Sequence, residues 1–135
     1  MSFGQFAFQT AVFNALNNDS NLTQTLGATI VDDVPHGTPF PFITMGDARS
    51  SEYDTKTDIG GDITLEVHLW SQYKGSKEVK QMMDRCHSLL HNSSLSVTGF
   101  NLINLRFEFS DIMRDPDGIT RHGVMRYRAI ILGTS

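Results

Sequence analysis

Basic residues, cysteine and long hydrophobic runs are all scarce in this 135-residue sequence, and each shortage excludes a class of protein. Cys86 is the single cysteine, so no intrachain disulfide can form, which fits assembly in a reducing cytoplasm. The longest apolar runs, such as residues 129–132, are too short to cross a bilayer, and we expect no membrane contact. The opening stretch MSFGQFAFQ has no basic residue before its apolar ones, so we expect no signal peptide.

The shortage of basic residues bears on nucleic acid. Lysine and arginine together number 11 against 15 acidic residues, which gives a formal net charge of −4. Duplex-binding proteins need clustered basic residues to neutralise phosphates. We therefore expect no sequence-specific nucleic-acid binding. The apolar fraction of 39% and charged fraction of 19% are ordinary for a folded protein, and the length suits a single domain over residues 1–135.

Two segments have the apolar periodicity of helices. Residues 3–16 carry no charged side chain. Their apolar residues fall near one stripe at helical spacing, which contains Phe6, Phe13 and Leu16 with Ala7, Val12 and Ala15. Residues 76–91 form the clearer helix, with a serine in the N-cap position. Its apolar stripe contains Val79, Met82, Met83, Cys86, Leu89 and Leu90.

Short or alternating apolar runs predict the strands. They cover residues 42–48, 62–73, 100–110 and 123–132, with residues 29–34 as a further short candidate. The apolar face of the strand at residues 100–110 is expected to hold Ile103, Leu105, Phe107 and Phe109. A change of parity at residues 101–104 predicts a β-bulge. Together the elements predict an α+β fold, with an antiparallel sheet of about four strands and two helices packed on one face.

No catalytic or cofactor-binding signature is present, so we expect neither an enzyme nor a cofactor. His87 and His91 lie four residues apart on the predicted helix, a spacing that can hold a metal but also suits the negative end of the helix dipole. Cys86 lies within the apolar stripe and suits a small core residue. Two alternatives stay open: a small cytoplasmic metal-dependent enzyme using His68, His87 or His91, and a ligand-binding domain with a large apolar pocket.

Two polar surfaces are candidates for contact with other subunits. Residues 49–61 have no apolar period, so we expect a long exposed loop, either a flexible connection or an arm that orders on assembly. Its candidate contact residues are Arg49, Glu52, Tyr53, Asp54, Lys56 and Asp58. The polar faces of the last two strands carry Arg106, Glu108, Arg126 and Arg128. This second set is either a solvated sheet face or a docking surface, where arginine is enriched.

The layout resembles a known family. A proline-rich lead enters the strand PFITMG at residues 41–46, and a polar loop follows. The strand ITLEVHLW at residues 63–70 then ends on tryptophan, the second helix ends on Leu89-Leu90, and the closing strand contains RYRAI at residues 126–130. In this order the features resemble the tail-completion proteins of long-tailed bacteriophages and gene transfer agents, also called tail terminators or head–tail joining proteins.

The resemblance implies a structural virion protein and no residue-level site. It implies a ring, usually of six copies, that caps the tail tube and joins the tail to the head. The implied partners are further copies of the chain, the tail-tube protein and a head–tail connector, with DNA passing through the ring. The implied location is the head–tail junction, after assembly in the bacterial cytoplasm. Another connector or tail-tube component is the alternative within the same particle.

Overall fold

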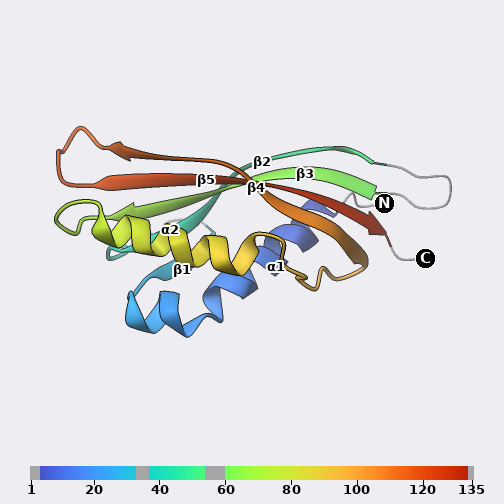
Figure 1. Cartoon of the computed structure of the whole chain (residues 1–135), viewed down its shortest axis with the longest axis horizontal. Helices are drawn as coiled ribbons and strands as arrows, with labels where there is room; N and C mark the ends of the chain where they lie inside the picture. Colours follow the sequence, from blue (N-terminus) through green and yellow to red (C-terminus); the bar gives the residue numbers. More distant parts are fainter. Residues whose placement is uncertain (1–3, 33–36, 54–59, 134–135) are drawn as a thin grey trace.

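The computed structural model describes residues 4–32, 37–53 and 60–133, which form one sheet with helices on a single face (Figure 1). The strands are β1 (Thr29–Val31), β2 (Phe42–Glu52), β3 (Gly60–Ser71), β4 (Phe100–Arg114) and β5 (Arg121–Gly133), in the spatial order β1-β2-β3-β5-β4. The helices are α1 (Gln5–Asn17), α2 (Lys77–Leu90) and the short π-helical segment η1 (Asn21–Thr25). None of the described helices is long and apolar enough to cross a membrane.

The predicted α+β class is confirmed, but the expected sheet of about four antiparallel strands is incomplete. The four long strands β2, β3, β5 and β4 do pair antiparallel. β1 adds a fifth strand at the edge, where it pairs parallel to β2. A parallel neighbour needs a longer connection than a tight hairpin, and the proline-rich segment before β2 supplies that length.

The exposed loop predicted at residues 49–61 is shorter than expected. Residues 49–52 belong to β2 and pair with residues 61–64 of β3, so both predicted ends of the loop are wrong. The side chains there are polar and give no periodic signal, but strand pairing uses backbone groups. β3 is also held by β5 on its other side and therefore offers a fixed template. Asp54, Lys56 and Asp58 lie outside the described residues.

The core lies between the helices and one face of the sheet. The stripe predicted for α2 is confirmed, since Val79, Met82, Met83, Cys86 and Leu90 are buried and Leu89 is partly buried. The sheet contributes the alternate residues of its two central strands. These are Ile63, Leu65, Val67 and Leu69 from β3 and Met125, Tyr127, Ala129 and Ile131 from β5.

The stripe predicted for α1 is confirmed except at Phe6. Val12 and Leu16 are buried and Ala7, Phe13 and Ala15 are partly buried, whereas Phe6 is 81% exposed and Phe8 is buried in its place. Apolar side chains occur all around this helix, so the pattern alone does not define which side faces the core. Packing of α1 against the sheet and α2 selects the Phe8 side.

Two irregularities in β4 change which of its side chains face the core. The pairing with β5 shifts between Leu102 and Asn104, as predicted, and again between Phe107 and Phe109. Each bulge adds a residue and reverses the alternation of side chains. Leu105 is buried, but Ile103 is 53% exposed and Phe109 is 43% exposed. The prediction that these residues share one apolar face is therefore wrong for Ile103 and Phe109.

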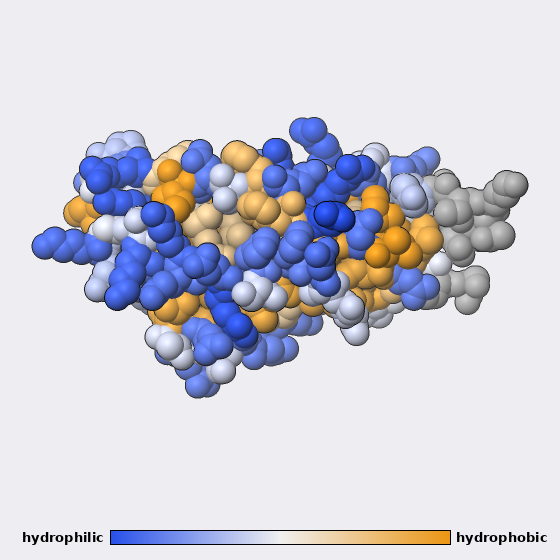
Figure 2. All heavy atoms as spheres, viewed as in Figure 1, coloured by the Kyte–Doolittle hydropathy of each residue, from blue (hydrophilic) through white to orange (hydrophobic). Residues whose placement is uncertain are grey.

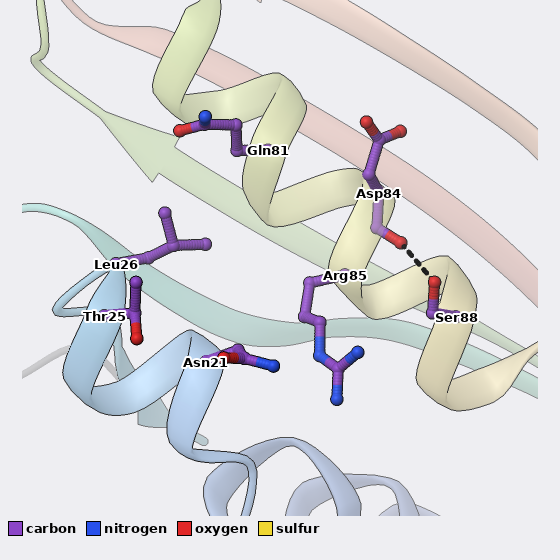
Figure 3. A pocket seen from close by; sticks show the side chains of 7 residues that line it. All are labelled: Asn21, Thr25, Leu26, Gln81, Asp84, Arg85 and Ser88. Carbon is purple, nitrogen blue, oxygen red and sulfur yellow. Dashed lines mark hydrogen bonds between the residues drawn. The ribbon is translucent and has the colours of Figure 1, made fainter.

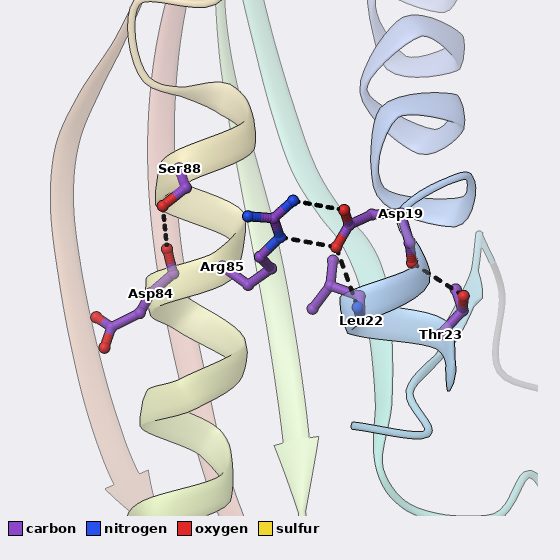
Figure 4. Close-up of polar contacts among 6 residues, drawn as sticks. All are labelled: Asp19, Leu22, Thr23, Asp84, Arg85 and Ser88. Carbon is purple, nitrogen blue, oxygen red and sulfur yellow. Dashed lines mark hydrogen bonds and ion pairs between the residues drawn. The ribbon is translucent and has the colours of Figure 1, made fainter. Parts of the chain in front are cut away.

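An ion pair joins the N-terminal helices to α2 (Figure 4). The Arg85 guanidinium donates two hydrogen bonds to the Asp19 carboxylate, from Nε at 2.9 Å and from Nη2 at 2.7 Å. The same carboxylate accepts the backbone N–H of Leu22 at 3.0 Å, at the start of η1. These bonds, led by those from Arg85, hold the pKa of Asp19 below its ordinary value. Asp19 therefore links α1, η1 and α2 at one point.

Candidate interaction surface

The sheet face away from the helices is the main candidate, and we call it the open face. Register places Arg49 of β2 opposite Thr64 of β3, Thr64 opposite Arg128 of β5, and Arg128 opposite Arg106 of β4. Three arginines therefore lie in one row across the sheet. The adjacent row contains Glu66, Arg126 and Phe109. The open face thus brings together Arg49, Arg106, Arg126 and Arg128, with Glu108 joined to Arg126 by an ion pair.

Two of the four arginines on the open face are paired within the chain. Arg128 binds both oxygens of Asp62, through Nε at 2.8 Å and Nη2 at 2.5 Å. This contact holds the pKa of Asp62 below its ordinary value. Arg126 lies 3.6 Å from a Glu108 oxygen and stacks over the Phe109 ring, with 5.1 Å between its guanidinium carbon and the ring centroid.

The other two arginines keep their charge available. Arg49 and Arg106 are exposed, and neither has a carboxylate partner in the described part of the chain. Arg106 also lies directly opposite Arg128, whose charge is balanced by Asp62. Arg106 can therefore bind an acidic group from another molecule.

Of the residues predicted in the loop, Tyr53 and Glu52 take different places. Tyr53 is exposed and borders a cleft of about 450 Å³ on the open face, together with Arg106, Glu108 and Arg128. Glu52 lies opposite Gly61, whose partner on β5 is the buried Ile131. Side chains opposite each other share a face, so Glu52 points to the helix side and does not join the open face.

A group of rings on the open face was not singled out from the sequence. His68 Nδ1 lies 2.6 Å from His122 Nε2, and His68 Nε2 lies 3.1 Å from Glu66. Trp70 stacks on His122, with 3.7 Å between the ring centroids. The two facing nitrogens share one hydrogen, because one must donate and the other accept. Burial, and then the nearby His68, lower the pKa of His122, which favours its neutral form.

The alternation of β3 already pointed to this group. Glu66, His68 and Trp70 occupy the non-core positions of that strand. His122 comes from the start of β5, which extends two residues before the predicted strand.

On the helix side, the described residues line two open clefts, one of them of about 260 Å³ with Met83, Phe107, Ile112 and Met125 in its lining. Figure 3 shows a cleft between η1 and α2 with a volume of about 340 Å³. Its lining is mainly polar, and Arg85, which borders it, is already bound to Asp19. It therefore lacks the apolar lining that the ligand-binding alternative requires.

His87 and His91 do come together, but in a structural arrangement. Their rings stack with 4.7 Å between centroids, and His91 Nδ1 accepts the backbone N–H of Phe107 at 3.1 Å. Within residues 4–32, 37–53 and 60–133, no three His, Cys, Asp or Glu side chains are grouped to hold a metal. Cys86 is fully buried, and burial raises the pKa of its thiol to about 12, so it stays protonated.

The two edges of the sheet differ in how much backbone they leave open. Along β4, the N–H of Asn92 binds the carbonyl of Leu105 at 2.8 Å, and His91 covers the N–H of Phe107. Beyond the second bulge, residues 109–114 have no second strand beside them in the described structure. On β2, β1 covers residues 42–44, and residues 45–52 have no described strand on that side. Open strand edges are templates for pairing with another chain.

The face of the molecule drawn in Figure 2 mixes polar and apolar side chains. In that view apolar side chains gather toward the end of the molecule beside the grey residues and are interrupted by hydrophilic ones elsewhere. The described structure thus has a sheet with helices on one side, a charged open face on the other side, and strand edges that are partly open.

The sequence matches the family model of the tail completion protein gp17 over residues 10–132, so the chain belongs to this family. The tail completion protein gp17 of Bacillus phage SPP1 is 28% identical over 93 residues, which is 69% of each chain. The predicted family is confirmed, and with it a structural role in tail completion and head–tail joining.

Two solved structures show the same fold. A chain in the virion of a native gene transfer agent particle matches with a TM-score of 0.88 and 21% identity, over 98% of this chain and 100% of that one. The bacteriophage SPP1 gp17 protein matches with a TM-score of 0.64 and 24% identity, over 92% of this chain and 88% of that one.

Proposed function

We propose that copies of this chain close into a ring, most simply a hexamer, that caps the finished tail tube and joins it to the head. The ring would sit at the head–tail junction, between the tail-tube protein and a head–tail connector, after assembly in the bacterial cytoplasm. Its work is binding, and it needs no cofactor. DNA would pass through the ring without sequence-specific contact, which suits the net charge of −4.

The uncovered sheet face is the observation that carries this proposal. The helices cover one side of the sheet, and the other side presents Arg49 and Arg106 without acidic partners in the described part of the chain. In the described structure, residues 45–52 of β2 and 109–114 of β4 also have no second strand beside them. A closed ring of identical copies joined head to tail would use both edges and leave the open face for partners. Tyr53 and the cleft beside Arg106 belong to the same surface. We include Asp54, Lys56 and Asp58 as predicted contacts.

Tail assembly in the presence and absence of the protein tests the proposal. Electron microscopy should show a ring at one tube end only when the protein is present, and only those tails should attach to heads. A mass measurement on the isolated complex gives the number of copies. Tails that end cleanly and join heads without the protein would contradict the proposal.

A charge reversal on the open face, compared with one elsewhere on the surface, tests whether the open face contacts a partner. Arg106→Glu should leave folding unchanged, because Arg106 has no ion pair in the described chain, and should weaken attachment of the ring to a partner. The matched control is Lys74→Glu in the exposed loop before α2, which should attach normally. Equal behaviour of the two variants would remove the open face from the contact.

A further inference from the structure

The two open strand segments run in opposite directions. β2 is antiparallel to β3, β3 to β5, and β5 to β4, so β2 and β4 are antiparallel to each other at the two sides of the sheet. A second copy in the same orientation would therefore bring its β2 antiparallel to β4, and the sheet would continue from one copy to the next. Antiparallel strands can pair in this way without a connecting segment.

Within the described structure, the last part of β4 is the part of its edge left available for this pairing. Val97 binds the N–H of Phe100, Asn92 binds the carbonyl of Leu105, and His91 binds the N–H of Phe107. The segment after α2 thus covers the first half of the edge. Residues 109–114 remain, and there the Asp111 carboxylate accepts the N–H of the next residue, Ile112, at 2.9 Å. This edge N–H is therefore covered by a side chain and not by a strand.

Side-chain faces and charges select one register. Asp111 lies opposite Val124 and Arg49 opposite Thr64, which places both on the open face. Both are exposed, and Arg49 has no carboxylate partner in the described chain. With Asp111 opposite Arg49, the neighbours Ile112 and Ala48 also become opposite, on the helix side. Opposite charges and an apolar pair then meet on the two faces, as stable antiparallel pairs require.

We propose that in the ring residues 109–112 of β4 pair antiparallel with residues 48–51 of β2 from a second copy, with Asp111 opposite Arg49 of that copy. This inference rests on the proposed ring and names the joint between its subunits. The Asp111 carboxylate exchanges the Ile112 N–H for the neighbouring guanidinium, and the N–H becomes free for a strand-to-strand hydrogen bond.

The proposed pairing displaces each copy along the strand direction relative to its neighbour, by an amount that agrees with a closed sheet. Within one chain, Arg49 is level with Arg128 of β5, whereas Asp111 is level with Val124, so the contact shifts the second copy along the strands by 128 − 124 = 4 positions. Four positions correspond to roughly 13 Å along a strand, against a width of roughly 19 Å for four strands. The strands then tilt by about 35°, which is within the range of closed sheets.

Disulfide trapping tests the register. Ser50 and Ser110 would be opposite each other on the helix side, so Ser50→Cys with Ser110→Cys should give crosslinked multimers on oxidation. Within one chain these residues are separated by β3 and β5 across the sheet and by four positions along it, which makes them roughly 19 Å apart and too far for an internal disulfide. The matched control combines Ser51→Cys with Ser110→Cys, which would point to opposite faces and should crosslink at least tenfold less. Buried Cys86 does not interfere.

Charge exchange provides a second, independent measurement. Asp111→Arg and Arg49→Asp should each reduce the ring population at least tenfold, and the double exchange should restore it. Lys74→Asp, which changes the charge as much as Arg49→Asp but lies in the exposed loop before α2, should leave the ring intact. This joint would be refuted if rings formed normally in both single variants, or if the control pair Ser51→Cys with Ser110→Cys crosslinked as well as the test pair. The proposed ring would not be affected by either result. A wild-type protein that never forms a ring on tails would overturn the proposed function, and the joint with it.

Discussion

Replacing Tyr127 by phenylalanine is expected to stabilise the protein by about 1 kcal/mol. The Tyr127 side chain is 1% exposed and packs edge-on against Phe107, with 5.7 Å between ring centroids. Its buried hydroxyl has no hydrogen-bond partner among the described residues. Burial, and then the nearby Cys86, raise the pKa of this hydroxyl, so it stays neutral.

The size of the effect follows from that burial. Burying a hydroxyl without a hydrogen-bond partner destabilises the folded state by roughly 1–3 kcal/mol, and its removal recovers this free energy. The small cavity left in place of the oxygen atom offsets part of that stabilisation. For 135 residues the unfolding entropy is about 0.28 kcal/mol/K, so 1 kcal/mol corresponds to a rise in Tm of about 3.5 °C.

Urea unfolding followed by circular dichroism, at one fixed protein concentration, gives the change in the free energy of unfolding. Tyr73→Phe is the control, because Tyr73 is 53% exposed and its hydroxyl can reach water, so its effect should be within about 0.5 kcal/mol of zero. A Tyr127→Phe variant that is less stable than the wild type by 1 kcal/mol or more would refute the reasoning, since it would mean that the hydroxyl is satisfied.

Three further predictions concern the core and its support. Phe8→Ala should lower the free energy of unfolding by about 3–5 kcal/mol, whereas Phe6→Ala should change it by less than about 0.5 kcal/mol, because Phe8 is fully buried and Phe6 is 81% exposed. Native Cys86 should resist a thiol reagent at pH 8 and react only on unfolding, because its pKa is raised to about 12; rapid labelling of the native protein would show that the thiol is accessible. Asp19→Ala should cost about 2 kcal/mol at pH 7, since it removes the Arg85 and Leu22 bonds. The folded pKa of Asp19 is lowered, so this stabilisation is present above its ordinary value of 3.8 and is lost as pH falls through the folded pKa; unfolding curves from pH 7 to pH 2 should therefore converge for wild type and variant.

Elements with one strong period were predictable from the sequence. In β3 a strand period of two residues places the apolar residues on one face, and in α2 a helical period of 3.6 residues does the same. The buried face of each element could therefore be assigned from the sequence. α1 shows the opposite case. Its apolar residues occur on all sides, so the buried side is decided by contacts with the sheet and α2, which are remote in sequence.

The open face was predictable in part for the same reason. Arg126 and Arg128 alternate with core residues of β5, and their side of the sheet follows from that pattern alone. Arg49 and Glu52 follow no such pattern, because the residues around them are polar on both faces. Their positions come from the partner strand: pairing with Thr64 places Arg49 on the open face, and pairing with Gly61 turns Glu52 to the helix side.

The bulge that the sequence did not reveal is also the feature on which the proposed joint depends. Without the register shift between Phe107 and Phe109, strict alternation from Leu105 would place Phe109 and Asp111 on the helix side. The added residue turns Phe109 under the Arg126 guanidinium and brings Asp111 to the open face at the uncovered end of β4. Bulges of this kind re-aim side chains near functional surfaces. The same irregularity therefore accounts for the failed prediction of the apolar face of β4 and for an acidic residue that faces outward where a neighbouring arginine could meet it.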